Sequence, residues 1–447
     1  SGGMSCPDPP PVRPETSGPR YTSYPTADRF HEGHGAADHR QALATRAAGP
    51  LSVYVHVPFC ESVCYYCACN KIVTKRHERA APYLDALDAE VALYAAALGG
   101  PVPVTQLHLG GGTPTFLSDD ELTRLMATLQ AHFPLAADAE VSIEVDPRTA
   151  DVDRLTHLRR LGFNRLSFGV QDFDPDVQAA VHREQSFLSV AALLHAARAL
   201  GFVSTNVDLI HGLPRQTPAS FARTLAQVTA MRPDRIALYA YAHLPERFKP
   251  QRRIDAAQLP GNAMRLQMVS DAARVFTSEG YESIGMDHFA LAHDSLAVAR
   301  REGRLHRNFQ GYSTRPDCDL LGLGVSAIGR VGPTYAQNTK SLEDYQAALA
   351  RGEFPVERGC TLTAEDLARR DVIMAVMCRG RIDHAAIEAA HGGRFADRFA
   401  RELAELAPMA DAGLVTLRPR ETVLTPAGWH RVRAIARVFD AHHGAGA

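Results

Sequence analysis

The chain has 447 residues, with 48 basic and 50 acidic side chains and a formal net charge of −2. This length exceeds what one hydrophobic core usually supports, so we expect a large domain with a smaller appendage. The near balance of charge argues against a general electrostatic grip on nucleic acid or on an anionic membrane. The sequence has no run of about 18 apolar residues, so it predicts no transmembrane span.

Residues 1–50 are rich in proline, glycine and polar residues and show no sustained periodicity. The first four, Ser1-Gly2-Gly3-Met4, have the form of a cloning scar before a native methionine, and no export signal follows. We expect disorder over the first dozen residues and then an arm packed onto the body of the protein. Its apolar anchors would be Tyr21, Tyr24, Pro25 and Phe30.

The first expected strand, at residues 52–57, leads into the densest chemical signal of the chain. Cys60, Cys64, Cys67 and Cys69 are four of its eight cysteines. Soft thiolates this close together suit zinc, an iron–sulfur cluster or a redox pair. A structural zinc site normally takes two separated pairs, and the other cysteines are scattered singly. A thioredoxin-like pair would use Cys64 and Cys67 but would leave the other two thiols unexplained.

A Cys-x3-Cys-x2-Cys run can ligate three corners of a [4Fe–4S] cluster and leave one iron open to a reactant. We therefore assign Cys60, Cys64 and Cys67 as cluster ligands. We expect Cys69 to serve turnover instead, because one intervening residue in an extended segment would direct its side chain away from the cluster. Clustered thiols in a chain without an export signal are typical of metal binding in a reducing cytoplasm.

Short apolar runs then alternate with helical patterns as far as residue 338. Expected strands after the first cover residues 105–109, 140–145, 165–170, 204–210, 235–241 and 320–328, and helical stretches such as 119–133 and 219–231 lie between most of them. Such alternation predicts a parallel sheet. A dinucleotide-binding fold is the main alternative, but Gly110-Gly111-Gly112 lacks the Gly-x-Gly-x-x-Gly spacing and Pro114 follows at once.

We therefore expect an α/β fold with an incomplete (β/α) barrel over residues 51–355. In barrels the functional groups lie where the strands end. The candidates at or just beyond expected strand ends are Cys60, Gly110, Glu144, Gln171, Asp208 and Tyr241.

Residues 356–447 change to a mainly helical pattern. Helices are expected over residues 364–377, 383–391 and 397–409, followed by short apolar segments at 414–417 and 422–424 and a last helix from 427. Helices followed by a small hairpin predict a winged-helix-like domain. Such domains often bind DNA, but Asp366, Asp371, Glu402 and Glu405 offset the arginines, so we expect no nucleic-acid partner.

With Asn70-Lys71 after the cysteines and Gly110-Gly111-Gly112-Thr113-Pro114-Thr115 farther on, the sequence resembles the radical S-adenosylmethionine (SAM) superfamily. Within it, the chain is most similar to the oxygen-independent coproporphyrinogen III oxidase family. The similarity covers most of the chain, from the Arg-Tyr-Thr-Ser-Tyr-Pro-Thr block at 20–26 through Gly-Met-Asp-His-Phe at 285–289 to Asn-Phe-Gln-Gly-Tyr at 308–312.

This resemblance implies a [4Fe–4S] cluster and two SAM molecules per chain. The first SAM would contact Tyr54, Gly111, Glu144, Ala242 and Ile328. The second would contact Tyr66, Gly112, Thr113, Gln171, Arg183 and Asp208. The family is expected to carry Phe where this chain has Tyr66, whose hydroxyl group therefore needs a partner or water.

The implied substrate is coproporphyrinogen III. Two of its four propionates would lose a β-hydrogen to a 5′-deoxyadenosyl radical and then CO2, giving the vinyl groups of protoporphyrinogen IX in haem biosynthesis. An electron donor to the cluster and an unknown final acceptor are required. Gln310 and Tyr312 are candidates for an active-site lid, and the carboxyl-terminal domain would help to cover the substrate. We expect a cytoplasmic monomer.

Three alternatives belong to other functional classes. A haem chaperone keeps the three-cysteine motif, but Cys69, the amino-terminal block at 20–26 and the long carboxyl-terminal domain favour the dehydrogenase. A related radical methyltransferase that opens haem has a similar cysteine loop and remains open at this point. A structural or nucleic-acid-binding zinc protein would be colourless and carry one zinc.

Overall fold

The computed structural model describes residues 21–68, 71–285, 287–308, 311–315 and 318–442. Its centre is a run of parallel strands connected through helices. They are β1 (Leu51–Val57), β4 (Val104–Gly111), β5 (Leu135–Val145), β6 (Arg165–Gln171), β7 (Ser204–His211) and β8 (Arg235–Ala240). The six strands expected between residues 52 and 241 are therefore confirmed, and so is the alternating βα organisation.

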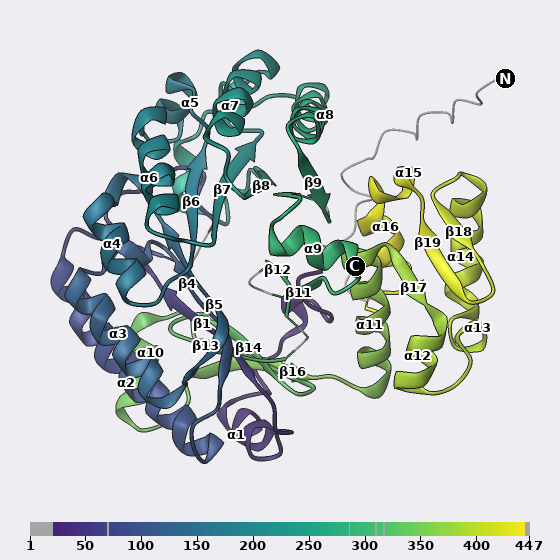
Figure 1. The fold of residues 1–447 in the computed structure, drawn as a ribbon. Coiled ribbons are helices and arrows are strands. Elements are labelled where there is room, and N and C mark those ends of the chain that lie inside the picture. Colours follow the sequence, from purple (N-terminus) through teal and green to yellow (C-terminus); the bar gives the residue numbers. More distant parts are fainter. Residues whose placement is uncertain (1–20, 69–70, 286, 309–310, 316–317, 443–447) are drawn as a thin grey trace.

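Further strands extend this sheet at both ends. They are β13 (Asp319–Leu323), β14 (Ile328–Val331), β15 (Thr334–Asn338) and β16 (Val356–Thr361) beyond β1, with β10 (His288–Leu291) and β9 (Tyr281–Ile284) beyond β8. The order is β16-β15-β14-β13-β1-β4-β5-β6-β7-β8-β10-β9. Within the described residues the two end strands do not pair, so the barrel is incomplete, as expected (Figure 1).

The single strand expected over residues 320–328 is wrong. The chain reverses between β13 and β14, which pair antiparallel. The reversal uses left-handed backbone at Gly324, with φ +99°, and at Ser326, with φ +62°. Only glycine adopts such a conformation without steric cost, so Gly324 favours a turn where the apolar pattern alone indicates a continuous strand.

Helices lie along the outer face of the curved sheet (Figure 1). They are α2 (Ala80–Leu98), α3 (Asp119–His132), α4 (Val152–Arg160), α5 (Pro175–Ala180), α6 (Phe187–Ala199), α7 (Pro218–Met231) and α8 (Asn262–Ser278). The smaller elements are α1 (Ala36–Ala44), α9 (Ser295–Arg301), α10 (Leu342–Ala350) and the hairpin of β11 (His306–Asn308) and β12 (Gly311–Ser313). The start of α3 follows from a capping box, because Ser118 Oγ accepts from the Glu121 amide at 3.2 Å and Glu121 Oε1 from the Ser118 amide at 2.8 Å.

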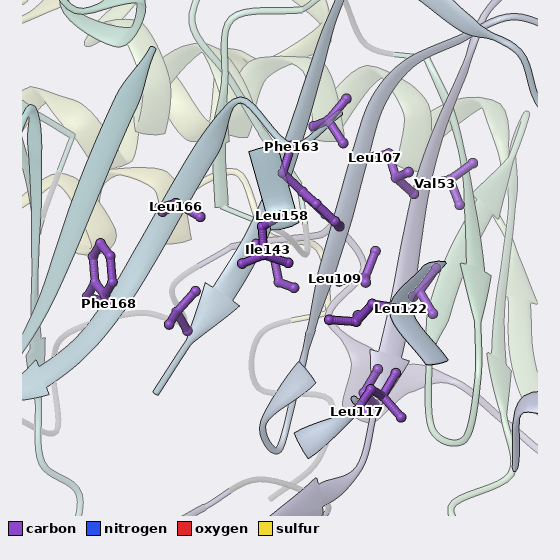
Figure 2. Close-up of a cluster of buried hydrophobic side chains, with 14 of the residues drawn as sticks. Val53, Leu107, Leu109, Leu117, Leu122, Ile143, Leu158, Phe163, Leu166 and Phe168 are labelled. Carbon is purple, nitrogen blue, oxygen red and sulfur yellow. The ribbon is translucent and has the colours of Figure 1, made fainter. Parts of the chain in front are cut away.

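The strands separate an apolar outer layer from a polar interior. Along β6, Leu166 and Phe168 are buried in the hydrophobic core between strands and helices, which also contains Ile143 and Leu158 (Figure 2). Each such side chain contributes roughly 1.5–3 kcal/mol by its burial. The intervening Ser167 lines the interior instead, as the two-residue period of a strand requires. Polar groups on the barrel strands are therefore directed inward.

The carboxyl-terminal domain lies to one side of the barrel (Figure 1). It contains α11 (Ala364–Arg379), β17 (Arg381–Asp383), α12 (His384–His391), α13 (Phe395–Arg398), α14 (Ala400–Asp411), β18 (Val415–Leu417), β19 (Glu421–Leu424), α15 (Pro426–Trp429) and α16 (Val432–Arg437). Its mainly helical character is confirmed. The helix expected over 397–409 is divided into α13 and α14 at Phe399, and the helix expected from 427 is divided into α15 and α16. The unexpected β17 completes a small sheet of order β17-β19-β18.

The arm packs on the carboxyl-terminal domain. Tyr21 and Tyr24 are buried in the core of that domain, and the Tyr21 hydroxyl donates to Asp440 Oδ2 at 2.8 Å. Pro25 and Phe30 are buried as well. The domain boundaries at residues 50 and 355 remain predictions. The strand β16 begins directly after residue 355 and still pairs with β15 of the large sheet. None of the described helices is both long and apolar enough to cross a bilayer.

A buried carboxyl group fixes the turn between β13 and β14 against α2. Glu90 accepts from the Gly324 amide at 2.7 Å, from the Tyr345 hydroxyl at 2.7 Å and from Asn338 Nδ2 at 2.8 Å. Burial raises the pKa of Glu90 to about 7, although these hydrogen bonds oppose the shift. The folded protein therefore holds a proton that the unfolded chain releases near pH 4.5, and stability falls as pH rises from about 4.5 to about 7.

Glu90→Gln should remove this pH dependence. We expect wild-type stability to decline by about 3 kcal/mol more than that of the variant across this pH window. Anaerobic denaturant unfolding of both proteins at pH 5, 6, 7 and 8 measures the difference. Parallel pH profiles for the two proteins would show that Glu90 does not titrate in this range.

Candidate active site

The carboxyl ends of β1 and β4 to β8 surround a cavity of about 800 Å³. Thirteen of the side chains or backbone positions expected at the site line it: Cys60, Cys64, Cys67, Tyr66, Gly111, Gly112, Thr113, Glu144, Gln171, Arg183, Asp208, Tyr241 and Ala242. They come from separate βα units, so only the barrel brings them together.

The other expected site residues lie elsewhere. Tyr54 lies on β1 beside the cavity, and its ring stacks on His108 at 5.9 Å between centroids. Ile328 lies on β14 and packs against a hydrophobic cluster that includes Phe30 and Tyr335, outside the described lining of the cavity. Tyr312 lines a neighbouring cavity. Cys69 and Gln310 lie outside the described residues.

The cysteine loop is closed at its base by a short parallel pair, β2 (Phe59–Cys60) and β3 (Ile72–Val73). The Ile72 amide donates to Pro58 O at 2.7 Å and the Thr74 amide to Cys60 O at 2.8 Å. The three thiols expected as ligands are 5%, 2% and 6% exposed at Cys60, Cys64 and Cys67. The loop therefore presents three buried sulfur atoms to the cavity.

Cationic side chains surround the middle thiol. Arg148 Nη2 and Arg183 Nη1 each lie 3.5 Å from Cys64 Sγ, and both arginines pair with Asp146, at 2.7 and 3.5 Å. Burial alone would raise the pKa of the Cys64 thiol, but Arg183, Lys71 and Arg148 outweigh this effect and lower that pKa. Because the thiolate is the form that ligates metals, this environment favours metal binding.

These residues fit an iron–sulfur cluster. The expected ligands are three buried thiols. Lys71 lies beside them, and its positive charge offsets the negative charge of thiolate ligands. No group of three or more His, Cys, Asp or Glu in the described residues is arranged to hold a single metal ion. A cubane cluster has no such requirement, since each thiolate binds a different iron.

Tyr66, which lies within the cysteine loop, has a partner for its hydroxyl group, which is hydrogen-bonded to the Cys64 sulfur. Burial is the main reason that the pKa of this phenol lies above its usual range, so Tyr66 remains protonated. The backbone carbonyl of Tyr66 accepts from Gln251 Nε2 at 3.3 Å.

The glycines after β4 allow close contact between strands and cavity. The Gly111 amide donates to Glu144 Oε2 at 3.3 Å, and the Gly112 amide to Val57 O at 2.8 Å. Gly111 has φ +120°, and a Cβ at this position would lie 2.7 Å from Val57 O. A Cβ at Gly112 would lie 2.6 Å from Pro58 O. Larger residues would therefore displace the backbone that leads into the cysteine loop.

Gly112→Ala should disturb this junction, because the added methyl group meets backbone atoms that cannot rotate away. We expect a loss of roughly 1–3 kcal/mol in the free energy of unfolding, typical of overpacking, together with a lower iron content. Gly49→Ala is the control, since a Cβ there meets nothing within 4 Å and Gly49 caps no helix. Thermal unfolding and iron analysis test the prediction. Equal values for both variants would contradict it.

A second group of expected residues occupies the β6–β7 side. Gln171 ends β6 with φ +69°, and its Oε1 atom is buried without a hydrogen-bond partner among the described residues. Asp208 on β7 accepts from Asn206 Nδ2 at 2.8 Å, and burial raises its pKa to about 7. Arg183 also donates to Gly169 O. Unsatisfied polar atoms facing a cavity are typical of a ligand site.

A smaller cavity of about 170 Å³ continues into the barrel. It shares Glu144, Ser167, Asp208 and Tyr239 with the large cavity. Tyr312, a candidate lid residue, lies on its wall.

Sequence reasoning missed several residues of the large cavity. Lys71 follows the cysteine loop and Arg148 follows β5, and both line the cavity. Their positions just after these segments are a weak sequence signal for a place in the site. Arg433 on α16 lines the same cavity from the carboxyl-terminal domain, and nothing in the sequence pattern indicates this. The carboxyl-terminal domain therefore contributes to the wall of the site.

Comparisons with known proteins agree with this geometry. The radical SAM superfamily model matches residues 54–228 and the HemN C-terminal domain model residues 362–430. An oxygen-independent coproporphyrinogen III oxidase of Escherichia coli K12 is 50% identical over 95% of this chain and 93% of its own. The corresponding Pseudomonas aeruginosa protein is 48% identical over 96% and 94%. A solved structure of the E. coli coproporphyrinogen III oxidase, described as a radical SAM enzyme, has a TM-score of 0.92 and covers 94% of this chain and 97% of its own, at 50% identity.

Proposed function

Because the chain belongs to the oxygen-independent coproporphyrinogen III oxidase family of radical SAM enzymes, we propose that it converts coproporphyrinogen III into protoporphyrinogen IX. The observation that carries the proposal is the set of three buried thiols at a cavity formed by strand ends. The reaction belongs to haem biosynthesis without oxygen.

The cluster and SAM together supply, when bound, a 5′-deoxyadenosyl radical that takes a hydrogen atom from a propionate β-carbon. The propionate then loses CO2, its Cα–Cβ bond becomes a vinyl double bond, and the one remaining electron passes to an external acceptor. Two propionates react in this way, so two vinyl groups form and two CO2 molecules leave.

The residues of the chain hold and orient these groups. Cys60, Cys64 and Cys67 would ligate the cluster, with Cys69 serving turnover. The Gly111 amide donates to Glu144 Oε2 at 3.3 Å, so a hydrogen-bond donor and an acceptor lie side by side. We propose that both contact the first SAM, together with Tyr54, Ala242 and Ile328.

We further propose a second SAM per chain. Its contacts would be Tyr66, Gly112, Thr113, Gln171, Arg183 and Asp208, which all line the cavity. The unpartnered Gln171 oxygen supports a ligand here. Gln310 and Tyr312 remain candidates to cover the reacting groups.

The remaining partners follow from the reaction. A reductant must supply electrons to the cluster, and an acceptor must take one electron for each vinyl group formed. We propose a monomer in the cytoplasm, where clustered thiols stay reduced.

Anaerobic incubation of the iron-reconstituted protein with SAM, a reductant, an electron acceptor and coproporphyrinogen III tests the function. We expect protoporphyrinogen IX by mass spectrometry. A haem chaperone would bind haem and leave the substrate unchanged, and a haem methyltransferase would consume haem instead. Either outcome without vinyl formation would contradict the proposal.

A further inference from the structure

Three arginines from separate parts of the fold surround a small pocket. Arg307 lies on β11, Arg330 on β14 and Arg370 on α11. Thr22 of the arm also lines the pocket, so the arm, the barrel and the carboxyl-terminal domain meet there. The described residues that line it include no Asp or Glu. Its positive character suits an anion.

The side chain of Arg307 is the main evidence for a ligand in this pocket. It is 9% exposed, and its Nε and Nη1 atoms have no hydrogen-bond partner among the described residues. Its guanidinium lies 4.5 Å from the centre of the Tyr312 ring, is hydrogen-bonded to the Tyr312 side chain and interacts with the charge of Asp287, so only Nε and Nη1 are left for a ligand. Buried N–H donors of a charged group without acceptors are costly, and a bound carboxylate would satisfy one of these two donors with a charge-assisted hydrogen bond.

The pocket adjoins the smaller cavity of the proposed active site. Asn308 lines both this pocket and the 170 Å³ cavity in the barrel. That cavity shares Asp208 and Glu144 with the large cavity at the cysteine loop. The pocket itself, about 20 Å³, has room for about one water-sized group, such as one carboxylate oxygen, but not for a pyrrole ring. A ligand would therefore reach it with a side arm.

We propose that Arg307, with Arg330 and Arg370, binds the carboxylate of a propionate that coproporphyrinogen retains. The inference rests on the proposed function. The substrate carries four propionates, of which two react near the cofactors and two survive. The arginine pocket lies one cavity beyond the cofactor site, so a carboxylate bound there is kept away from the reacting position. Such an anchor orients the macrocycle and favours reaction of the opposite propionates.

The alternative is that the arginines only join three parts of the fold. Arg330 does donate to Gly332 O at 2.8 Å and to Cys318 O at 3.1 Å, contacts that support the hairpin edge. These contacts belong to Arg330, whereas the Nε and Nη1 atoms of Arg307 have no hydrogen-bond partner among the described residues. A ligand role and a structural role for Arg307 predict different results in a binding experiment.

The test uses coproporphyrin III, the stable oxidised macrocycle with the same four propionates, titrated anaerobically into the reconstituted protein and followed by fluorescence. Arg307→Met should weaken its binding about 10- to 100-fold, the equivalent of one charge-assisted hydrogen bond. Arg307→Lys keeps the charge without the planar fork and should recover only part of this loss. Iron content and cleavage of SAM without substrate should stay unchanged in both variants.

Arg304→Met is the matched control, because Arg304 lies three residues away, is half exposed and pairs with Glu302 at 2.6 Å. It should bind coproporphyrin III as wild type does. If Arg307→Met does not fold, Arg370→Gln tests the same pocket and should also weaken binding. Wild-type affinity in a folded Arg307→Met or Arg370→Gln protein would overturn the anchor while leaving the proposed function intact. Failure of wild type to make protoporphyrinogen would instead reject the function itself.

Discussion

Cys64→Ala is expected to remove most of the iron and all cleavage of SAM. Cys64 is the most buried of the three thiols, and it is the one that Arg148 and Arg183 both contact at 3.5 Å. Removing it would delete one proposed cluster ligand and leave the buried Arg183 and the partly exposed Arg148 without their sulfur partner, so two effects act in the same direction. Iron analysis, the visible spectrum and methionine formation measure the loss.

Cys360→Ala is the control for this experiment. Cys360 is also buried, but it packs in a separate hydrophobic cluster with Phe30 and Tyr335. We expect wild-type iron content in this variant. Normal iron and normal SAM cleavage in Cys64→Ala would mean that the ligands have been misassigned, and one zinc in place of iron would favour the zinc alternative.

Asp208→Asn is expected to lower substrate conversion by about 100-fold or more while the cluster and one round of SAM cleavage persist. The change conserves shape, but it removes the negative charge that we propose for contact with the second SAM, and charged hydrogen bonds are worth about 1.5–3 kcal/mol each. Arg183→Ala should also abolish conversion. It is the less specific variant, since Arg183 touches Cys64 as well.

Anaerobic ligand stoichiometry beside product analysis checks this prediction. Wild type should bind two SAM molecules and Asp208→Asn one. Because burial raises the pKa of Asp208 to about 7, its carboxylate form and therefore second-site binding should increase as pH rises from 6 to 8 in wild type but not in the variant. One SAM bound to wild type, with normal conversion by Asp208→Asn, would contradict the two-cofactor proposal.

Much of the barrel could be predicted because its strands are short apolar runs that end at polar or glycine residues. β6 and β7 follow this rule closely, and each carries an expected site residue at or near its end. The division of residues 320–328 into β13 and β14 could not be predicted from apolar character, since it depends on left-handed backbone at Gly324 and Ser326. β17 has three residues, too few for a periodic pattern.

At the site, too, residues in a local motif could be predicted, whereas residues brought in by tertiary packing could not. Cys60, Cys64 and Cys67 form a motif in one short segment, so their spacing alone predicts them as ligands. Arg433 reaches the large cavity only because the carboxyl-terminal domain packs over the barrel, and no local signal records that contact. Ile328, a proposed contact of the first SAM, also packs its side chain against the cluster around Phe30, and the sequence could not indicate that packing.

The most direct test of the central claim follows the hydrogen atom. Coproporphyrinogen III deuterated at the propionate β-carbons is incubated anaerobically with the reconstituted enzyme, and the products are analysed by mass spectrometry. We predict one deuterium in each 5′-deoxyadenosine formed, with one CO2 and one vinyl group for each molecule of SAM cleaved in productive turnover. Vinyl formation without deuterium in 5′-deoxyadenosine would contradict the account.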